Sequence, residues 1–131
     1  MIVIDASALL ELLLGTDRAQ KVAVRALASH ERLHAPHLLD IEIAQALRRL
    51  VQLKDITPRR AEQALADFVG IALERYPHRD LLARIWQLRE SVTAYDGAYV
   101  ALAEALDAPL LTCDAKLARS HGHSARIEIV P

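Results

Sequence analysis

The sequence predicts an α/β protein, a three-layer α/β/α sandwich around a short, mainly parallel sheet. Short apolar runs rich in β-branched residues alternate along the chain with longer segments of helical periodicity. Strands that read as continuous apolar runs are typical of parallel sheets, because helices cover both faces of such sheets. The alternation of the two kinds of segment favours the same architecture. No internal repeat or low-complexity segment interrupts the pattern.

The first half of the chain contains two expected strands and three expected helices. Residues 2–4 are a β-branched run that ends at Asp5, as a buried strand does. A helix over 7–14 stops at Gly15, and Asp17 opens a second helix towards Ser29. After a brief strand at 33–36, the spacing of apolar residues predicts an amphipathic helix over 37–54. Its expected buried face consists of Leu38, Ile41, Ala44, Leu47 and Leu50.

The second half follows the same alternation. Thr57 and Pro58 begin a helix that continues to about Val69, because proline is favoured in the first helical turn. We expect Trp86 to be buried in a helix over 79–90, together with Leu82, Ile85 and Leu88. The remaining expected elements are strands at 71–76, 109–112 and 127–130 and helices at 93–106 and 115–119.

Length and composition restrict the class of protein. The chain has 131 residues, is 53% hydrophobic and 25% charged, and is the size of one domain spanning 1–131. Its single cysteine, Cys113, excludes an internal disulfide and favours a reducing, cytoplasmic location. The longest apolar stretch is too short to span a membrane. A formal net charge of -1 means that nucleic-acid binding would require charges sorted onto different surfaces.

Acidic residues recur where the expected strands end. Asp5 and Asp114 follow strands, Glu42 lies early in the helix after the second strand, and Asp96 lies in the first turn of another helix. Ligands of parallel sheets bind at the carboxyl ends of the strands. Converging carboxylates repel one another unless a cation is present, and an all-oxygen site suits Mg²⁺ or Mn²⁺. Such a site can activate a water for attack on a phosphodiester.

Each acid also has a purely structural interpretation. Asp5 and Asp114 are suited to cap the helices that follow them. Residues 93–96 approximate a capping box, with aspartate at the position where glutamate is preferred. Glu42 is suited to the solvated side of its helix, near the positive end of the helix dipole. Spacing alone leaves both interpretations open.

The segments around the four acids resemble, in order, the four motifs of the PIN domain nucleases. These segments are residues 2–9 (IVIDASAL), 35–42 (APHLLDIE) with 46–49 (ALRR), 95–103 (YDGAYVALA) and 111–117 (LTCDAKL). Within this superfamily, a chain of this size most resembles the VapC toxins of type II toxin–antitoxin pairs.

The resemblance implies a Mg²⁺- or Mn²⁺-dependent endoribonuclease that cleaves structured RNA such as tRNA or rRNA and inhibits growth. It also implies a VapB-type antitoxin, a homodimer, and the option of a higher toxin–antitoxin assembly. Asp5, Glu42, Asp96 and Asp114 are carried over as the catalytic and metal-binding acids, and Ser7 and Thr112 as hydroxyls that orient them. The alternatives are a PIN nuclease of RNA processing and a catalytically silent PIN adaptor.

Two departures from the family pattern affect the metal site. Gln45 stands where many members have asparagine, and Lys116 and Leu117 stand where many have a further acid. With one carboxylate fewer, we expect one tightly held ion and a second that arrives with the substrate. Gly97 is also unusual, because glycine within a helix is unfavourable relative to alanine. It allows a close approach of backbone or substrate, or has no role.

The candidate RNA contacts are Arg48, Arg49 and Lys116. Arg48 and Arg49 belong to a basic cluster with Lys54, Arg59 and Arg60. This cluster is suited to RNA phosphates, to an acidic antitoxin tail, or simply to a solvated helix end. Lys116 lies close to Asp114 in the sequence and is expected to contact RNA.

Two other classes that use a strand-end aspartate fit less well. Phosphatases of the haloacid dehalogenase type need a second acid two residues after the first, where this chain has Ser7. Response-regulator receivers need paired acids near the start, and this chain has only Asp5 there.

Overall fold

A five-stranded parallel sheet forms the centre of the protein, in a computed structural model that describes residues 1–27 and 30–131. The strands are β1 (Ile2–Ile4), β2 (Leu33–Pro36), β3 (Leu73–Tyr76), β4 (Leu110–Thr112) and β5 (Ile127–Ile129). Their order is β3-β2-β1-β4-β5, and every neighbouring pair is parallel. The predicted α/β class with a short parallel sheet is confirmed.

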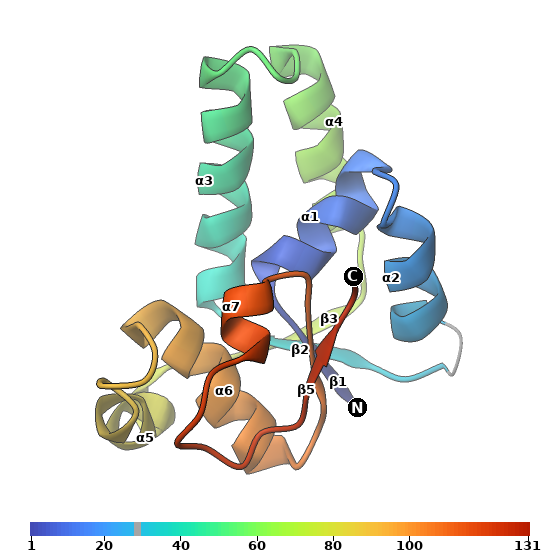
Figure 1. Ribbon diagram of the computed structural model, residues 1–131. Coiled ribbons are helices and arrows are strands. Elements are labelled where there is room, and N and C mark those ends of the chain that lie inside the picture. Colours follow the sequence, from blue (N-terminus) through green and yellow to red (C-terminus); the bar gives the residue numbers. More distant parts are fainter. Residues whose placement is uncertain (28–29) are drawn as a thin grey trace.

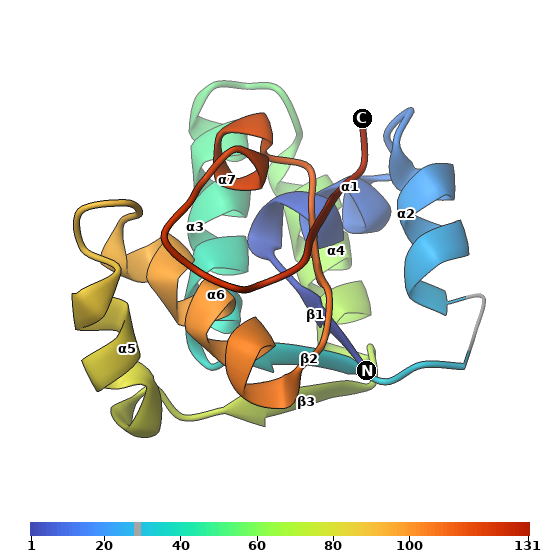
Figure 2. The same cartoon turned by 60° about the horizontal axis from the view of Figure 1, so that its bottom comes forward.

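Helices cover both faces of this sheet (Figures 1 and 2). The helices are α1 (Ala6–Leu14), α2 (Ala19–Leu27), α3 (Leu38–Gln52), α4 (Pro58–Val69), α5 (Leu82–Gln87), α6 (Ala94–Leu106) and α7 (Ala115–Ala118), with a 3₁₀ turn, η1 (Arg79–Leu81), before α5. On one face, α6 packs over β1 and β2 and is covered by α5; α1, α2 and the α3–α4 hairpin lie on the other. Within the described part of the chain, no helix is long and apolar enough to cross a membrane.

The chain changes direction at the centre of the sheet. It builds β1, β2 and β3 outwards in one direction, and then returns to place β4 and β5 on the other side of β1. The neighbours β1 and β4 are fully buried, and the backbone N–H of Asp5 continues their ladder by donating to Leu111. Their carboxyl ends therefore meet at a topological switch point, where ligands of parallel sheets bind.

The buried faces of two helices differ from the prediction. In α3 the buried residues are Leu39, Ile43 and Leu47, whereas Ile41 is 70% exposed. Apolar residues in this helix form two interleaved stripes, so periodicity alone allows two phases, and packing against α1 and α4 selects one of them. In α5 the prediction is wrong for Trp86 and Leu82, which are 67% and 57% exposed because this short helix turns only its Ile85 side towards α6.

Gly97 lies on the buried side of α6, against α5. A Cβ atom added there would lie 3.4 Å from Cγ2 of Ile85 and 3.7 Å from Cγ2 of Val92, which are ordinary contacts. We therefore expect Gly97→Ala to raise the free energy of unfolding by up to about 1 kcal/mol, because alanine is the better helix former. Urea unfolding of the two proteins measures the difference. A less stable variant would mean that α5 and α6 need glycine for their close approach.

The predicted element boundaries otherwise hold to within a few residues. Gly15 ends α1 with a left-handed backbone (φ 62°), and Thr57 caps α4 by accepting from the N–H of Arg60. The predicted end of the second helix, Ser29, lies outside the described residues.

Candidate active site

The four acids that the sequence singles out lie around one cavity at the switch point. Asp5 directly follows β1, Asp114 follows β4, Glu42 lies in the second turn of α3, and Asp96 lies in the first turn of α6. The cavity has a volume of about 160 Å³. Its lining consists of Asp5, Ala6, Ser7, Glu42, Asp96, Tyr99 and Asp114. The fold thus brings together side chains that are as much as 109 positions apart, from Asp5 to Asp114.

Asp5 is fixed by hydrogen bonds to both of its carboxylate oxygens. Ser7 donates its hydroxyl to Oδ1 at 2.7 Å, and the N–H of Ala8 donates to the same oxygen at 3.0 Å. Thr112 donates its hydroxyl to Oδ2. The hydroxyls of Ser7 and Thr112 are 3.2 Å apart and accept in turn from the N–H groups of Cys113 and Asp114. One network therefore joins the ends of β1 and β4.

The helix-capping interpretation holds for Asp5 and Asp114, whereas among the described residues the Asp96 carboxylate does not complete a capping box with Thr93, and Glu42 is half-buried rather than solvated. Asp5 caps α1 through Ala8, and Asp114 caps α7 by accepting from the N–H of Lys116 at 2.8 Å. Thr93 caps α6 by accepting from the N–H of Asp96 at 3.1 Å. Capping and the cavity do not compete, since each capping carboxylate also lines the cavity.

Tyr99 is a site residue that the sequence reasoning missed. Its hydroxyl donates to Oε1 of Glu42 at 2.6 Å, and its side chain is 1% exposed. It lies three positions after Asp96 on α6, so both side chains face the same side of that helix. That helical spacing from a predicted site residue was the signal that would have identified it.

Burial is the main influence on the charge states of the carboxyl groups. It raises the pKa of Asp5, and the negative charge of Asp114 raises it further, although the hydrogen bonds to Asp5 oppose both effects. Burial also raises the pKa of Glu42. The hydrogen bond from Tyr99 lowers this pKa, and the negative charges of Asp96 and Asp5 raise it further.

The pKa of Asp96 is also raised, and within the described part of the chain no hydrogen bond to its carboxylate opposes the rise. Burial raises its pKa, as do the charges of Asp114 and Asp5, and the ammonium of Lys116 lowers it. No hydrogen bond from another described residue reaches its carboxylate. The ionised forms of Asp5, Glu42 and Asp96 are therefore disfavoured, and a cation bound among them would offset that cost.

The donor set fits a hard divalent cation. All of its charged ligands are carboxylates, which Mg²⁺ and Mn²⁺ prefer, and the hydrogen bonds leave lone pairs free on several of them. Among residues 1–27 and 30–131, no three His, Cys, Asp or Glu side chains are arranged as a ready-made metal site. Mg²⁺ commonly keeps several waters and takes only one or two carboxylates directly.

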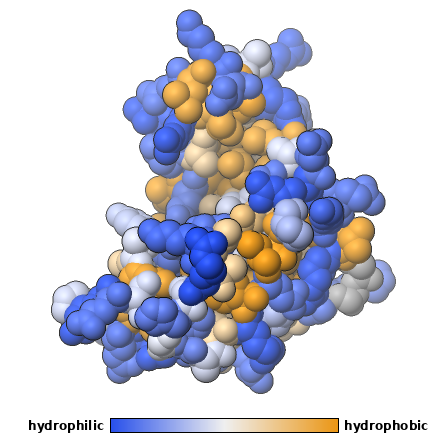
Figure 3. Space-filling model, in the orientation of Figure 1, coloured by the Kyte–Doolittle hydropathy of each residue, from blue (hydrophilic) through white to orange (hydrophobic). Residues whose placement is uncertain are grey.

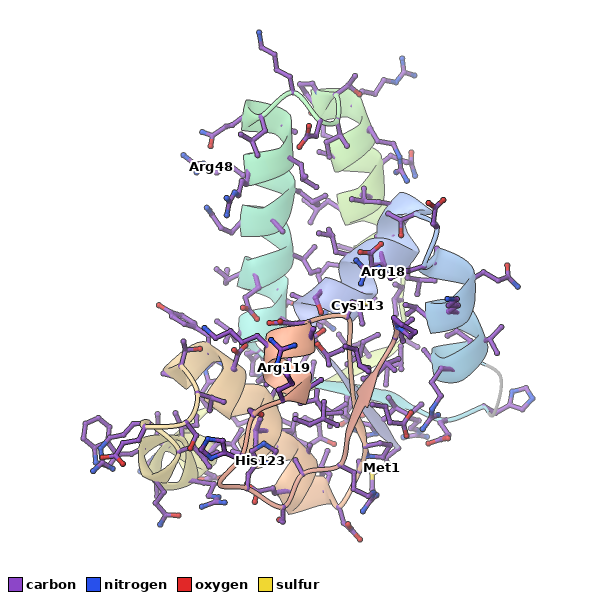
Figure 4. The ribbon with its side chains drawn as sticks, in the orientation of Figure 1. Met1, Arg18, Arg48, Cys113, Arg119 and His123 are labelled. Atoms are coloured by element: carbon purple, nitrogen blue, oxygen red, sulfur yellow. The ribbon has the colours of Figure 1, made fainter. Side chains whose placement is uncertain are left out.

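The three candidate RNA contacts lie in different places. Lys116 is near enough to Asp96 to influence its charge. Arg48 and Arg49 are exposed on α3, outside the carboxylate cavity, and Arg48 extends from the helix into solvent (Figure 4). Arg49 lies two helical turns from Glu42, about 10 Å along the axis and on the same side of α3. Arg60 of the basic cluster instead joins α4 to α1, by donating to the carbonyl of Leu13 at 2.9 Å.

Comparisons with known proteins agree with this fold. Residues 2–121 match the PIN domain, so the chain belongs to the PIN domain family. Ribonuclease VapC12 of Mycobacterium tuberculosis is 44% identical over 130 residues, which cover 99% of each chain. Within the PIN domains, this chain therefore belongs with the VapC ribonucleases, and the family expected from the four motifs is confirmed.

Two solved structures share the fold at low sequence identity. The structure of Mycobacterium tuberculosis VapC20, a sarcin-ricin loop cleaving toxin, superposes with a TM-score of 0.68 at 16% identity, covering 100% of both chains. VapBC2 from Rickettsia felis, bound to a DNA fragment from their promoter, gives a TM-score of 0.63 at 15% identity, covering 98% of each chain.

Proposed function

We propose that this protein is the toxin of a VapBC-type pair, an endoribonuclease that depends on Mg²⁺ or Mn²⁺ and hydrolyses phosphodiester bonds in structured RNA. The RNA is tRNA or rRNA, and its cleavage inhibits translation and growth. The observation that best supports the proposal is the set of four carboxylates around one cavity at the switch point. The full-length similarity to VapC12, a named ribonuclease, adds to it.

In this proposal Asp5, Glu42, Asp96 and Asp114 hold the cation. When bound there, a divalent cation would supply Lewis acidity to the phosphate and would lower the pKa of an attacking water. Asp5 provides a rigid ligand, because Ser7, Thr112 and the helix N-terminus fix both of its oxygens.

The other side chains around the cavity orient the carboxylates or place a positive charge beside them. Tyr99 holds Oε1 of Glu42 and leaves Oε2 free to face the cavity. Ser7 is already engaged with Asp5 and with the N–H of Cys113, so it acts as an orienting hydroxyl and water is the nucleophile. Lys116, beside Asp96, places a positive charge where RNA phosphate approaches.

A map of new RNA 5′ ends after brief induction tests the proposal. Wild type is compared with Asp5→Asn, which keeps a residue able to cap α1. We expect a few sharp new ends in tRNA or rRNA that are absent with the variant. Soluble wild-type protein that produces no new ends would overturn the ribonuclease proposal and favour the silent adaptor.

The antitoxin proposal is supported by an apolar surface on the α3–α4 hairpin, which projects from the sheet (Figure 3). Ile41, Leu53 and Leu65 are exposed there, and exposed apolar patches are typical of interfaces. A solved toxin–antitoxin complex from Klebsiella pneumoniae shares the fold, with a TM-score of 0.60 at 18% identity over 91% of each chain. We propose that a VapB-type antitoxin covers this hairpin, and that the toxin is a homodimer which assembles further with it.

Tyr99→Phe is expected to weaken Mn²⁺ binding by about 10-fold, the usual effect of losing a hydrogen bond to a metal ligand. The phenyl ring still fills the buried site, but Glu42 loses its only hydrogen-bond donor among the described residues. Titration of Mn²⁺ followed by electron paramagnetic resonance measures the affinity without RNA. Tyr95→Phe is the matched control, because Tyr95 lies on the same helix and is exposed. Equal Mn²⁺ affinities of wild type and Tyr99→Phe would contradict the positioning role.

A further inference from the structure

A second, larger cavity adjoins the carboxylates. It has a volume of about 480 Å³, and Asp96 lines both it and the carboxylate cavity. One wall is the segment before α6, and the other is α7 with the residues that follow it. Its lining consists of Arg89, Glu90, Ser91, Val92, Thr93, Asp96, Lys116, Leu117, Arg119, Ser120 and His121. We call it the side cavity.

The side cavity contains cations that the fold itself does not use. Neither Lys116 nor Arg119 makes a side-chain hydrogen bond or ion pair with another described residue, and both are exposed. Arg84 and Arg75 differ in this respect, because each is bound to a carboxylate. Arg119 lies directly after α7 (Figure 4). Unpaired cations beside a carboxylate cavity are suited to phosphate oxygens.

A third cation is held in place at the rim. The guanidinium of Arg89 stacks on the Trp86 ring, 4.7 Å from its centroid, and donates to the carbonyl of Trp86 at 3.0 Å. This contact gives the exposed Trp86 a role, since a stacked arginine loses less freedom when it binds an anion.

The rest of the lining combines hydroxyl and apolar groups with the acid Glu90 and the imidazole of His121. Thr93 and Ser91 provide hydroxyls, and Val92 and Leu117 provide apolar surface. Pockets for small organic ligands are usually about 300–1,000 Å³ and combine apolar walls with a few polar groups. A nucleoside with its phosphate has this size and this mixture of surfaces.

We propose that the side cavity binds one unstacked nucleotide of the RNA, adjacent to the bond that is cleaved, with Lys116 and Arg119 on its phosphate. The proposal rests on the ribonuclease function and specifies its substrate class. A base enters a side cavity only after it leaves its stack, which is easy in a loop and costly in a paired helix. The enzyme therefore selects phosphodiesters in unpaired loops.

The test compares two RNAs and two double variants. The probes are a short fluorescein-labelled RNA stem–loop and a fully paired RNA duplex of the same length, bound in EDTA and followed by anisotropy. Lys116→Ala with Arg119→Ala removes the two cations, and both residues are exposed, so folding is preserved. Lys21→Ala with Arg32→Ala removes the same charge from exposed positions outside both cavities.

We expect wild type to bind the stem–loop more tightly than the duplex. The Lys116 and Arg119 double variant should bind the stem–loop at least about 10-fold more weakly, and its slope of log K against log salt should fall by about 0.7, the value for one single-strand phosphate. The control variant should change stem–loop affinity by less than about 2-fold. With 4-thiouridine in the loop, photo-crosslinks should map to residues 89–93 or 117–121.

The outcomes separate this proposal from the ribonuclease function. If wild type cleaves the stem–loop with Mg²⁺ but the double variant binds it normally, the side cavity has no role in RNA binding. If both RNAs bind equally and weaken equally in the variant, Lys116 and Arg119 are a general phosphate contact and the nucleotide site is wrong. If wild type neither binds nor cleaves any RNA, the ribonuclease function fails and this proposal fails with it.

Discussion

Asp96→Asn is expected to lower the rate of RNA cleavage by about 100-fold or more, the effect of losing one preorganised electrostatic group at a reacting phosphate. The same variant, without divalent cation, is expected to unfold at a temperature about 3 °C higher than wild type, for a gain of about 1 kcal/mol. One substitution thus damages the activity and improves the stability.

The stability gain follows from the charges around Asp96. Burial and the carboxylates of Asp114 and Asp5 raise its pKa, so its ionised form is disfavoured in the fold. Its place in the first turn of α6 acts in the opposite direction, by about 0.3–1 kcal/mol. The net rise of the pKa shows that burial and repulsion exceed the opposing influences. A folded protein that binds this proton more tightly loses stability as pH rises above about 4, and asparagine removes that loss.

Thermal unfolding without Mg²⁺ measures the stability gain of the neutral side chain. The further change when Mg²⁺ is added measures how strongly each protein binds the cation. Wild type should gain stability with Mg²⁺ by mass action, whereas Asp96→Asn should gain little. Asp55→Asn is the control, because Asp55 is exposed at the far end of the α3–α4 hairpin. Wild-type cleavage rate, or an unchanged Mg²⁺ response, in Asp96→Asn would show that Asp96 is not a ligand.

The sequence was sufficient for most of the fold because local signals and topology agree. Gly15, Thr57 with Pro58, and Thr93 each mark a helix boundary through a cap or a positive φ that the structure contains. The error in α3 arises because the sequence contains two signals of equal strength. Ile41 and Ile43 both fit an amphipathic α3, and only contacts with α1 and α4 decide which is buried.

The candidate site was predictable to a similar extent. Positions after strands and early in helices singled out all four acids, and the resemblance to PIN domains favoured a metal site over plain helix caps. Asp5, Glu42, Asp96 and Asp114 all line the cavity. Tyr99 was missed because its function depends on a contact across 57 positions, from α6 to α3. The side cavity was invisible for the same reason, since its two walls are far apart in the sequence and meet only in the fold.

Glu104→Gln is expected to destabilise the fold by about 2 kcal/mol at pH 7, the size of a charge-assisted hydrogen-bond pair that solvent partly screens. Glu104 lies on α6 and accepts from Nε and Nη2 of Arg84 on α5, at 2.9 and 3.0 Å. It also accepts from the hydroxyl of Ser124, so it joins α5, α6 and the segment before β5.

The loss should depend on pH in a defined direction. The hydrogen bonds from Arg84 hold the pKa of Glu104 at about 2, below the value of 4.5 for the free side chain. Between these two values the unfolded chain binds the proton and the folded chain does not, so stability falls as pH falls through this window. The contribution of Glu104 is complete above pH 4.5 and is lost towards pH 2.

Urea unfolding of wild type and Glu104→Gln at a series of pH values from 7 to about 3 tests this window. The difference in free energy of unfolding should be largest near pH 7 and should shrink steadily below pH 4.5, where the wild-type carboxylate begins to lose its advantage. Glu62→Gln, on the exposed side of α4, should show no such trend. A difference that stays constant down to the lowest pH would mean that Glu104 contributes by packing, and that the Arg84 ion pair adds nothing to the joint between α5 and α6.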